Sequence, residues 1–226
     1  MSAHESVTID TSLGATPSQQ AVLASVAVGG IVVQQVAVDS IEPSQLGAHQ
    51  GHVRGLLGEN FLKYFDVLID NEQQILTLDQ TSGLQDALSG EHLQLLRFGS
   101  FNGSPTADRI VVRLTVPSFL QEPLLFLVDS GTNTAMLYPS PGLARRAMQS
   151  SQQGRVRSLD DTQNCQYEKA RLELGSSTFR GIELAACEGL TRNKTDTDGL
   201  LPTRIFRQLF IRHRGAYVIA NPGRSR

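Results

Sequence analysis

The sequence contains no tryptophan, two cysteines and no large excess of either charge. Its formal net charge of −2 gives no electrostatic reason to expect nucleic acid or an anionic membrane as a partner. Two cysteines, Cys165 and Cys187, are too few for a disulfide framework, and their redox state stays open. A content of 40% hydrophobic and 19% charged residues is typical of a folded, soluble globular protein.

Long apolar runs and dense metal-ligand clusters are also missing. No run approaches the roughly 20 apolar residues of a membrane-spanning helix, so we expect no membrane span. The opening MSAHESVTID has neither a basic segment nor an apolar core, so we expect no signal peptide in it; an upstream export signal would leave the compartment open. His49 and His52 have metal-like spacing but sit between glycines, which favours a polar loop. We expect no metal and no cofactor.

Short β-branched and aliphatic runs, separated by glycine and proline, dominate the chain. They predict an all-β protein with a few short helices. The expected strands lie near residues 21–28, 31–38, 66–70, 74–79, 109–116, 123–128, 168–174, 178–187 and 216–220. The expected helices lie near residues 59–64, 142–150 and 203–209.

The chain resembles itself at a fixed interval. The stretch VAVGGIVVQQVAV (26–38) matches LELGSSTFRGIEL (172–184), and in both two alternating strands flank a glycine turn, as in a hairpin. Matched positions, such as Gly29 and Gly175, are 146 residues apart. Two later matches keep the same order: Gly55 with Gly199, 144 apart, and Ile69 with Ile211, 142 apart. Three ordered matches with little drift predict two copies of one unit.

This repeat divides the chain. We expect a partial unit at 1–80, a Gly- and Ser-rich linker at 81–107 and a complete unit at 108–226. The second unit carries PLLFLVDSGTNTAML, in which an apolar run delivers Asp129 into a loop of Ser130, Gly131 and Thr132. At the 146-residue interval, a first-unit counterpart of Asp129 would fall at position −17, before Met1. We therefore expect the first unit to begin after its own aspartate.

Asp-Ser-Gly by itself is ordinary turn chemistry, because Asp bonds the backbone two residues on and Gly accepts positive φ. Here, however, a wholly apolar run precedes it, Thr132 adds a hydroxyl, and DGLLP follows about 70 residues later. The combination resembles the retropepsin-like aspartyl proteases, whose bacterial members often carry two such units in one chain. The resemblance covers the second unit and the latter part of the first. Asp198 stands before Gly199, where viral members usually have an apolar residue.

The resemblance implies an aspartic-type endopeptidase acting on a peptide or protein substrate. Asp129 matches the catalytic aspartate, with Ser130, Gly131 and Thr132 completing the motif; Gly199, Leu200 and Leu201 match the segment that supports the active-site loop. Two aspartates about 3 Å apart share one proton, so that one serves as base and the other as acid. The second carboxylate comes from a symmetry-related unit, in the same chain or in a second chain.

No other aspartate fits this second role well. Asp10, in TIDTSLG, lacks glycine at the third place and aligns with the flap region, the hairpin that closes over substrate in this family. Asp196 and Asp198 are interpreted as turn residues. Four further aspartates are interpreted as solvated strand ends: Asp39, Asp66, Asp70 and Asp79. The second unit's own flap is expected between residues 150 and 168, with Gly154 as its hinge or tip, although a polar loop explains that composition equally well.

Three hypotheses remain open at this stage. The enzyme gains its second aspartate from an upstream segment, or two chains form a homodimer and each contributes Asp129. Alternatively, the chain is a catalytically inactive, protease-like peptide-binding or scaffold module. Whether residues 1–226 alone are active is not decided by the sequence.

Overall fold

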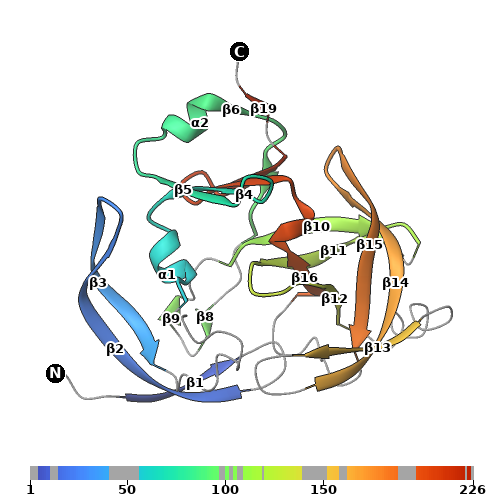
Figure 1. The fold of residues 1–226 in the computed structure, drawn as a ribbon, viewed down its shortest axis with the longest axis horizontal. Coiled ribbons are helices and arrows are strands. Elements are labelled where there is room, and N and C mark those ends of the chain that lie inside the picture. The colour runs from blue at the N-terminus through green and yellow to red at the C-terminus, as the bar shows by residue number, and fades with distance from the viewer. Residues whose placement is uncertain are drawn as a thin grey trace.

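The structure, a computed structural model, describes most of the chain. Its described residues are 5–10, 15–40, 56–96, 100–101, 104–105, 109–118, 120–138, 152–157, 162–187, 197–221 and 223–224. These residues are mostly strands, which confirms the predicted all-β class (Figure 1). The expected helix at 142–150, the His49–His52 pair and Gly55 lie outside the described residues. No helix in the described ranges is both long enough and apolar enough to cross a membrane.

The largest sheet belongs to the second half of the chain. Its strands are β10 (Val111–Val116), β11 (Leu120–Asp129), β12 (Ala135–Leu137), β13 (Gln152–Arg157), β14 (Thr162–Leu174), β15 (Ser177–Cys187) and β16 (Gly199–Pro202). They follow the order β10-β11-β16-β12-β15-β14-β13, and β10 also pairs with β14. The sheet therefore curls back on itself, and its inner side chains form a core.

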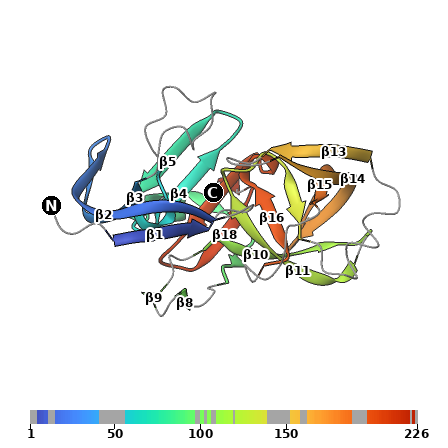
Figure 2. The ribbon, with the colours of Figure 1, turned by 90° about the horizontal axis from the view of Figure 1, so that it is seen from below.

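A smaller sheet holds the first three strands, β1 (Glu5–Asp10), β2 (Ala15–Val28) and β3 (Ile31–Ser40), in that order. The same antiparallel arrangement occurs in β13-β14-β15. Gly29 turns β2 into β3 with φ +57°, and Gly175 turns β14 into β15 with φ +55°. These glycines stand 146 positions apart, the interval found in the sequence. Figures 1 and 2 show the two groups of strands on opposite sides of the molecule.

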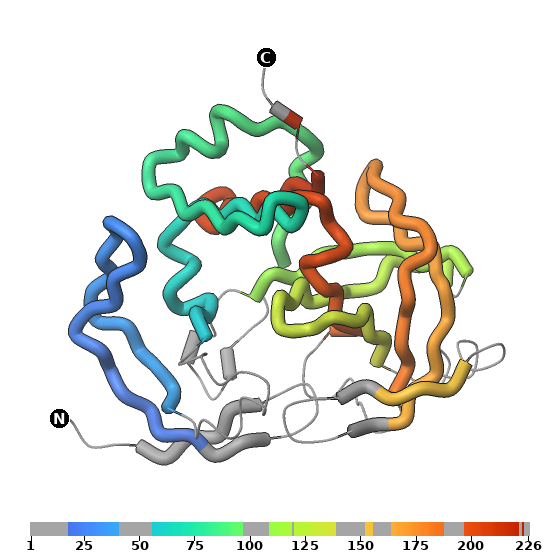
Figure 3. Tube along the Cα trace, viewed as in Figure 1, coloured from blue at the N-terminus to red at the C-terminus, as the bar shows by residue number. Residues whose placement is uncertain are grey.

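A five-stranded sheet joins the two halves of the chain. It contains β4 (Asp66–Asp70), β5 (Ile75–Asp79), β7 (Leu93–Gln94), β17 (Gln208–Arg212) and β18 (Tyr217–Ala220), in the order β5-β4-β17-β18-β7. The central contact is antiparallel, with Leu68 opposite Phe210. Figure 3 shows these two strands side by side although they lie far apart in sequence. The seam thus pairs Ile69 with Leu209, from segments that lie 140 residues apart in sequence.

The remaining elements are short. They are the helices α1 (Glu59–Leu62) and α2 (Gly83–Ala87), the 3-10 turn η3 (Thr203–Ile205), and the strand pairs β6 (Leu88–Ser89) with β19 (Gly223–Arg224) and β8 (Ser100–Phe101) with β9 (Ser104–Pro105). The helix expected at 203–209 is wrong beyond its first turn. Residues from Gln208 onward form β17 instead, because pairing with β4 buries Leu209, Phe210 and Ile211.

One apolar core runs through the described chain. It includes Phe61 and Phe65 from the first half, Phe126 from β11, and Leu209 from β17. Phe126 and Leu209 are completely buried, and Phe126 anchors the strand that leads into the loop after β11. The position of that loop is thus fixed from below by packed side chains.

Candidate active site

Asp129 is the last residue of β11, and its position follows from the alternation along that strand. Leu124, Phe126 and Val128 point into the core and are buried. Asp129 comes one residue after Val128, at the point where the chain leaves the core, and is half-buried. A carboxylate here is held by a rigid strand while it still reaches the surface.

The Asp-Ser-Gly-Thr loop is closed by side-chain to backbone hydrogen bonds. The Gly131 N–H donates to Asp129 Oδ1 at 2.7 Å, which forms an Asx turn. The Thr132 hydroxyl donates to the Thr134 carbonyl at 3.0 Å, and the Thr134 N–H lies 3.3 Å from the same hydroxyl oxygen. Ser130 and Gly131 are exposed. These bonds use only Oδ1 of the carboxylate and so orient the group without enclosing it.

Strand β16 lies between β11 and β12, which are consecutive in the chain but not adjacent in the sheet. It runs parallel to β11, with Leu201 opposite Val128, and antiparallel to β12, with Leu200 opposite Met136. Gly199, Leu200 and Leu201 are all buried. The DGLLP segment therefore forms a strand that pairs with both β11 and β12, the two strands on either side of the Asp129 loop.

Position 199 requires glycine because the backbone of β16 lies very close to that of β12 at this point. A Cβ at this position would lie 2.2 Å from the Met136 carbonyl oxygen and 2.6 Å from the Phe126 ring. Both neighbours are buried within the sheet, so neither can withdraw easily. Glycine at this position is thus a packing requirement of the β11-β16-β12 arrangement.

Asp198 is more than the turn residue that the sequence indicated, because it is buried and joined to β11. Its N–H donates to the Leu125 carbonyl at 2.6 Å, and the Leu125 N–H donates to Asp198 Oδ2 at 2.8 Å. Its carbonyl also accepts from the Tyr138 N–H at 2.8 Å. Asp198 therefore ties β11 to the residue after β12. The sequence feature that could have indicated this role is the position of Asp198 directly before Gly199.

Tyr138 is a second residue that sequence reasoning missed. Its side chain is 2% exposed, and its hydroxyl has no hydrogen-bond partner among the described residues. Burial raises the pKa of the Tyr138 phenol, the Asp129 carboxylate raises it further, and Arg109 opposes the rise. The phenol is thus held neutral and is electrostatically coupled to Asp129.

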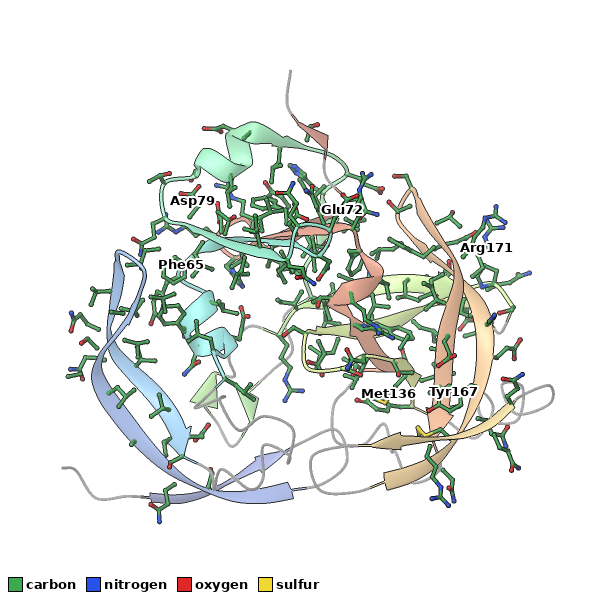
Figure 4. The ribbon with its side chains drawn as sticks, viewed as in Figure 1. Phe65, Glu72, Asp79, Met136, Tyr167 and Arg171 are labelled. Atoms are coloured by element: carbon green, nitrogen blue, oxygen red, sulfur yellow. A yellow bond between two sulfur atoms is a disulfide. The ribbon has the colours of Figure 1, made fainter. Side chains whose placement is uncertain are left out.

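Asp66, Asp70 and Asp79 belong to the five-stranded sheet, whereas Asp129 belongs to the seven-stranded sheet. Asp66 and Asp70 are buried in β4, which corrects their interpretation as solvated strand ends. Both are buried because β4 is an inner strand of the five-stranded sheet. Burial raises the pKa of Asp66, whereas the Gln73 N–H lowers that of Asp70 despite desolvation. Asp79, at the end of β5, lies far from Met136 of β12 (Figure 4).

Three other candidates differ in how far the structure describes them. Asp39 is exposed near the end of β3, in agreement with a solvated position. Asp10 ends β1 opposite Ala15, in a hairpin arranged like β13 and β14, and its side chain lies outside the described residues. Asp196 lies outside them as well.

Strands β13 and β14 form an antiparallel pair across much of the segment expected to hold the flap. Gly154 is neither its hinge nor its tip, because it lies within β13 opposite Cys165. A Cβ there would meet the Tyr167 ring at 2.5 Å.

Cys165 and Cys187 form a disulfide between β14 and β15, so the redox state that the sequence left open is oxidised in this structure. Tyr167 packs beside this disulfide with Met136 (Figure 4).

Comparisons with known proteins are sparse. No family model matches the chain, and no curated protein matches it. Among solved structures, a retropepsin-like aspartic protease from Rickettsia conorii is similar, with a TM-score of 0.40 and 13% sequence identity. The similarity covers 60% of this chain and 94% of that one. In the described ranges, no group of His, Cys, Asp and Glu is arranged to hold a metal ion.

Proposed function

We propose that the protein is an aspartic-type endopeptidase of the retropepsin-like family, with Asp129 as one of two paired catalytic aspartates. The observation that carries the proposal is the loop itself. Asp129 ends a buried strand, its Oδ1 is oriented by the Gly131 N–H, and Leu200 and Leu201 support the loop from the inserted strand β16. A fixed but accessible carboxylate is what a general base requires.

We further propose that the chain consists of two related units, at 1–80 and 108–226, joined by residues 81–107. Support comes from the matching hairpin turns at Gly29 and Gly175 and from the seam between β4 and β17. Two positive-φ residues within β3 and β15, Gln35 and Gly181, are also 146 positions apart. A backbone irregularity repeated at the same interval is difficult to attribute to chance strand patterns.

The proposed reaction uses a water molecule between two carboxyl groups. The ionised aspartate takes a proton from the water, and the water oxygen attacks the peptide carbonyl carbon. The protonated aspartate donates its proton to the carbonyl oxygen. When the tetrahedral intermediate collapses, the aspartate that took the water's proton gives it to the leaving amine, the other aspartate takes a proton from an intermediate hydroxyl group, and the peptide bond breaks. In this scheme Ser130, Gly131 and Thr132 keep the loop in shape.

In this proposal, the second catalytic carboxylate comes from outside the second unit, residues 108–226. In the described chain, β11 is the only strand that both ends in aspartate and pairs in parallel with another strand. The first unit has an apolar surface that suits a partner: Leu56 and Leu57 are 73% and 44% exposed, whereas their counterparts Leu200 and Leu201 are 2% and 0% exposed. A second copy of the chain, or a segment outside residues 1–226, would supply a second strand that ends in aspartate.

Cleavage of a mixed peptide library by residues 1–226, across roughly pH 3 to 7, tests the proposal. A shared proton requires one aspartate ionised and one protonated, so activity is expected to fall at both ends of a bell-shaped profile. Light scattering on the same samples tells whether activity accompanies a dimer. Folded protein that cleaves nothing, both as residues 1–226 and when extended by upstream codons, would contradict the proposed activity.

A further inference from the structure

A close contact between a buried histidine and a partly buried glutamate joins the two halves of the chain, well separated in sequence from the Asp129 loop. His213 directly follows β17, and its side chain is 3% exposed. Glu59 is the first residue of α1, and its side chain is 18% exposed. The His213 Nε2 and Glu59 Oε1 atoms are 2.5 Å apart. The two groups form a salt bridge when the imidazole is protonated.

The contact made by the other ring nitrogen, Nδ1, determines which protonation state of His213 makes its contact with Glu59 favourable. His213 Nδ1 lies 2.6 Å from the Phe65 carbonyl oxygen, which can only accept, so Nδ1 carries a proton. In the neutral ring Nε2 would then present a lone pair to the Glu59 carboxylate. Only a second proton on the imidazole makes this contact attractive. Occupation of both nitrogens thus favours the charged form of His213 on geometry alone.

The surrounding charges act in the same direction. Asp66 of β4 is buried and interacts electrostatically with His213, and Asp79 of the adjacent strand β5 stands opposite Asp66. Two cations of the second half, Arg212 and Arg214, also act on Asp66. Asp66 thus interacts electrostatically with Asp79 and with two guanidinium groups, and a protonated His213 places a positive charge beside two carboxyl groups, those of Glu59 and Asp66. Tyr217 of β18 adds a buried phenol to the group.

We propose that His213 and Glu59 form a proton-dependent latch between α1 and the end of β17, closed when the imidazole is charged and weakened when it is neutral. The latch lies at the end of the β4–β17 seam where Asp66 stands opposite Arg212. Its opening would loosen the connection between the two halves. The latch responds to pH, and it does not depend on the proposed peptidase activity.

The direction of the pH effect follows from the ring's environment. Burial by itself lowers the pKa of His213, but Glu59, the Phe65 carbonyl and Asp66 outweigh it and raise the pKa above the ordinary 6.5. A group whose pKa is raised on folding contributes stability that is complete below its unfolded value. That contribution is lost as the pH rises through the folded value. The latch is therefore closed in acid and opens on the alkaline side of pH 6.5.

Thermal unfolding of the whole chain between pH 5 and 9 tests the latch. The wild-type midpoint is expected to fall further over this range than that of His213→Gln, because only the wild-type protein loses a charged imidazole as the pH rises. Glu59→Gln should lose the same pH dependence, because its amide can donate to the neutral ring. His92→Gln is the matched control, since His92 is exposed and stacks on Tyr217 at the same sheet.

A second readout needs no stable variant. The ring signals of the five histidines can be titrated by NMR in the wild-type chain, and that of His213 can be assigned through Glu59→Gln, which should shift its midpoint down. A His213 midpoint above 6.5 is expected. A midpoint at or below that value, or equal pH slopes for wild type and Glu59→Gln, would overturn the latch. Because both readouts follow folding and protonation, neither outcome depends on peptide cleavage.

Discussion

Asp129→Asn is expected to reduce peptide cleavage by at least about 100-fold, the lower range for loss of a general acid or base. Asparagine keeps an oxygen that can accept the Gly131 N–H, so the Asx turn and the fold should survive. What it removes is the carboxylate that takes the proton from water. Cleavage rates and the circular dichroism of the same preparations provide the measurement.

Asp79→Asn provides the matched control. Asp79 also ends a strand and also accepts a backbone N–H two residues on, from Thr81 at 2.7 Å. Because it belongs to the five-stranded sheet, its variant should keep wild-type cleavage. Equal cleavage by wild type and Asp129→Asn, or equal losses in the two variants, would remove Asp129 from the catalytic step.

Gly199→Ala is expected to lower the free energy of unfolding by about 3 kcal/mol or more, at the upper end of the usual cost of overpacking. The added methyl group would meet the Met136 carbonyl oxygen at 2.2 Å, so β16 must move away from β12. Urea unfolding of the purified variant measures the loss. Because β16 also supports β11, cleavage should fall together with stability.

Gly30→Ala is the control for this substitution. Gly30 lies in the β2–β3 turn, and a Cβ there would meet no atom within 4 Å. Its free energy of unfolding should stay within about 0.5 kcal/mol of wild type, as for most surface substitutions. A Gly199→Ala protein as stable as Gly30→Ala would show that β16 is not packed between β11 and β12 as described.

The local features of the fold were predictable from sequence. Alternating apolar residues predicted the hairpin of β14 and β15, and Gly175 marked its turn because a positive φ favours glycine. Asp129 and Gly131 predicted the Asx turn in the same way. These features depend on residues close together in the chain, so pattern and propensity are sufficient to find them.

The long-range features were not predictable in this way. Asp66 and Asp70 read as solvated because nothing local shows that β17 will pair with β4. The same pairing converted the end of an expected helix into β17, since tertiary burial outweighs helix propensity. Asp198 and Tyr138 were missed for a related reason: their roles arise only when β16 enters between β11 and β12.

The most direct test of the central claim, that Asp129 acts in a catalytic pair rather than in a binding groove, is the affinity of a transition-state analogue. A peptide carrying a secondary alcohol at the scissile position would be titrated calorimetrically at acid pH against the matched amide peptide. The wild-type protein is expected to bind the alcohol at least about 100-fold more tightly than the amide, and Asp129→Asn is expected to lose this preference. Equal affinity of the wild-type protein for both peptides would contradict the account and indicate a peptide-binding module.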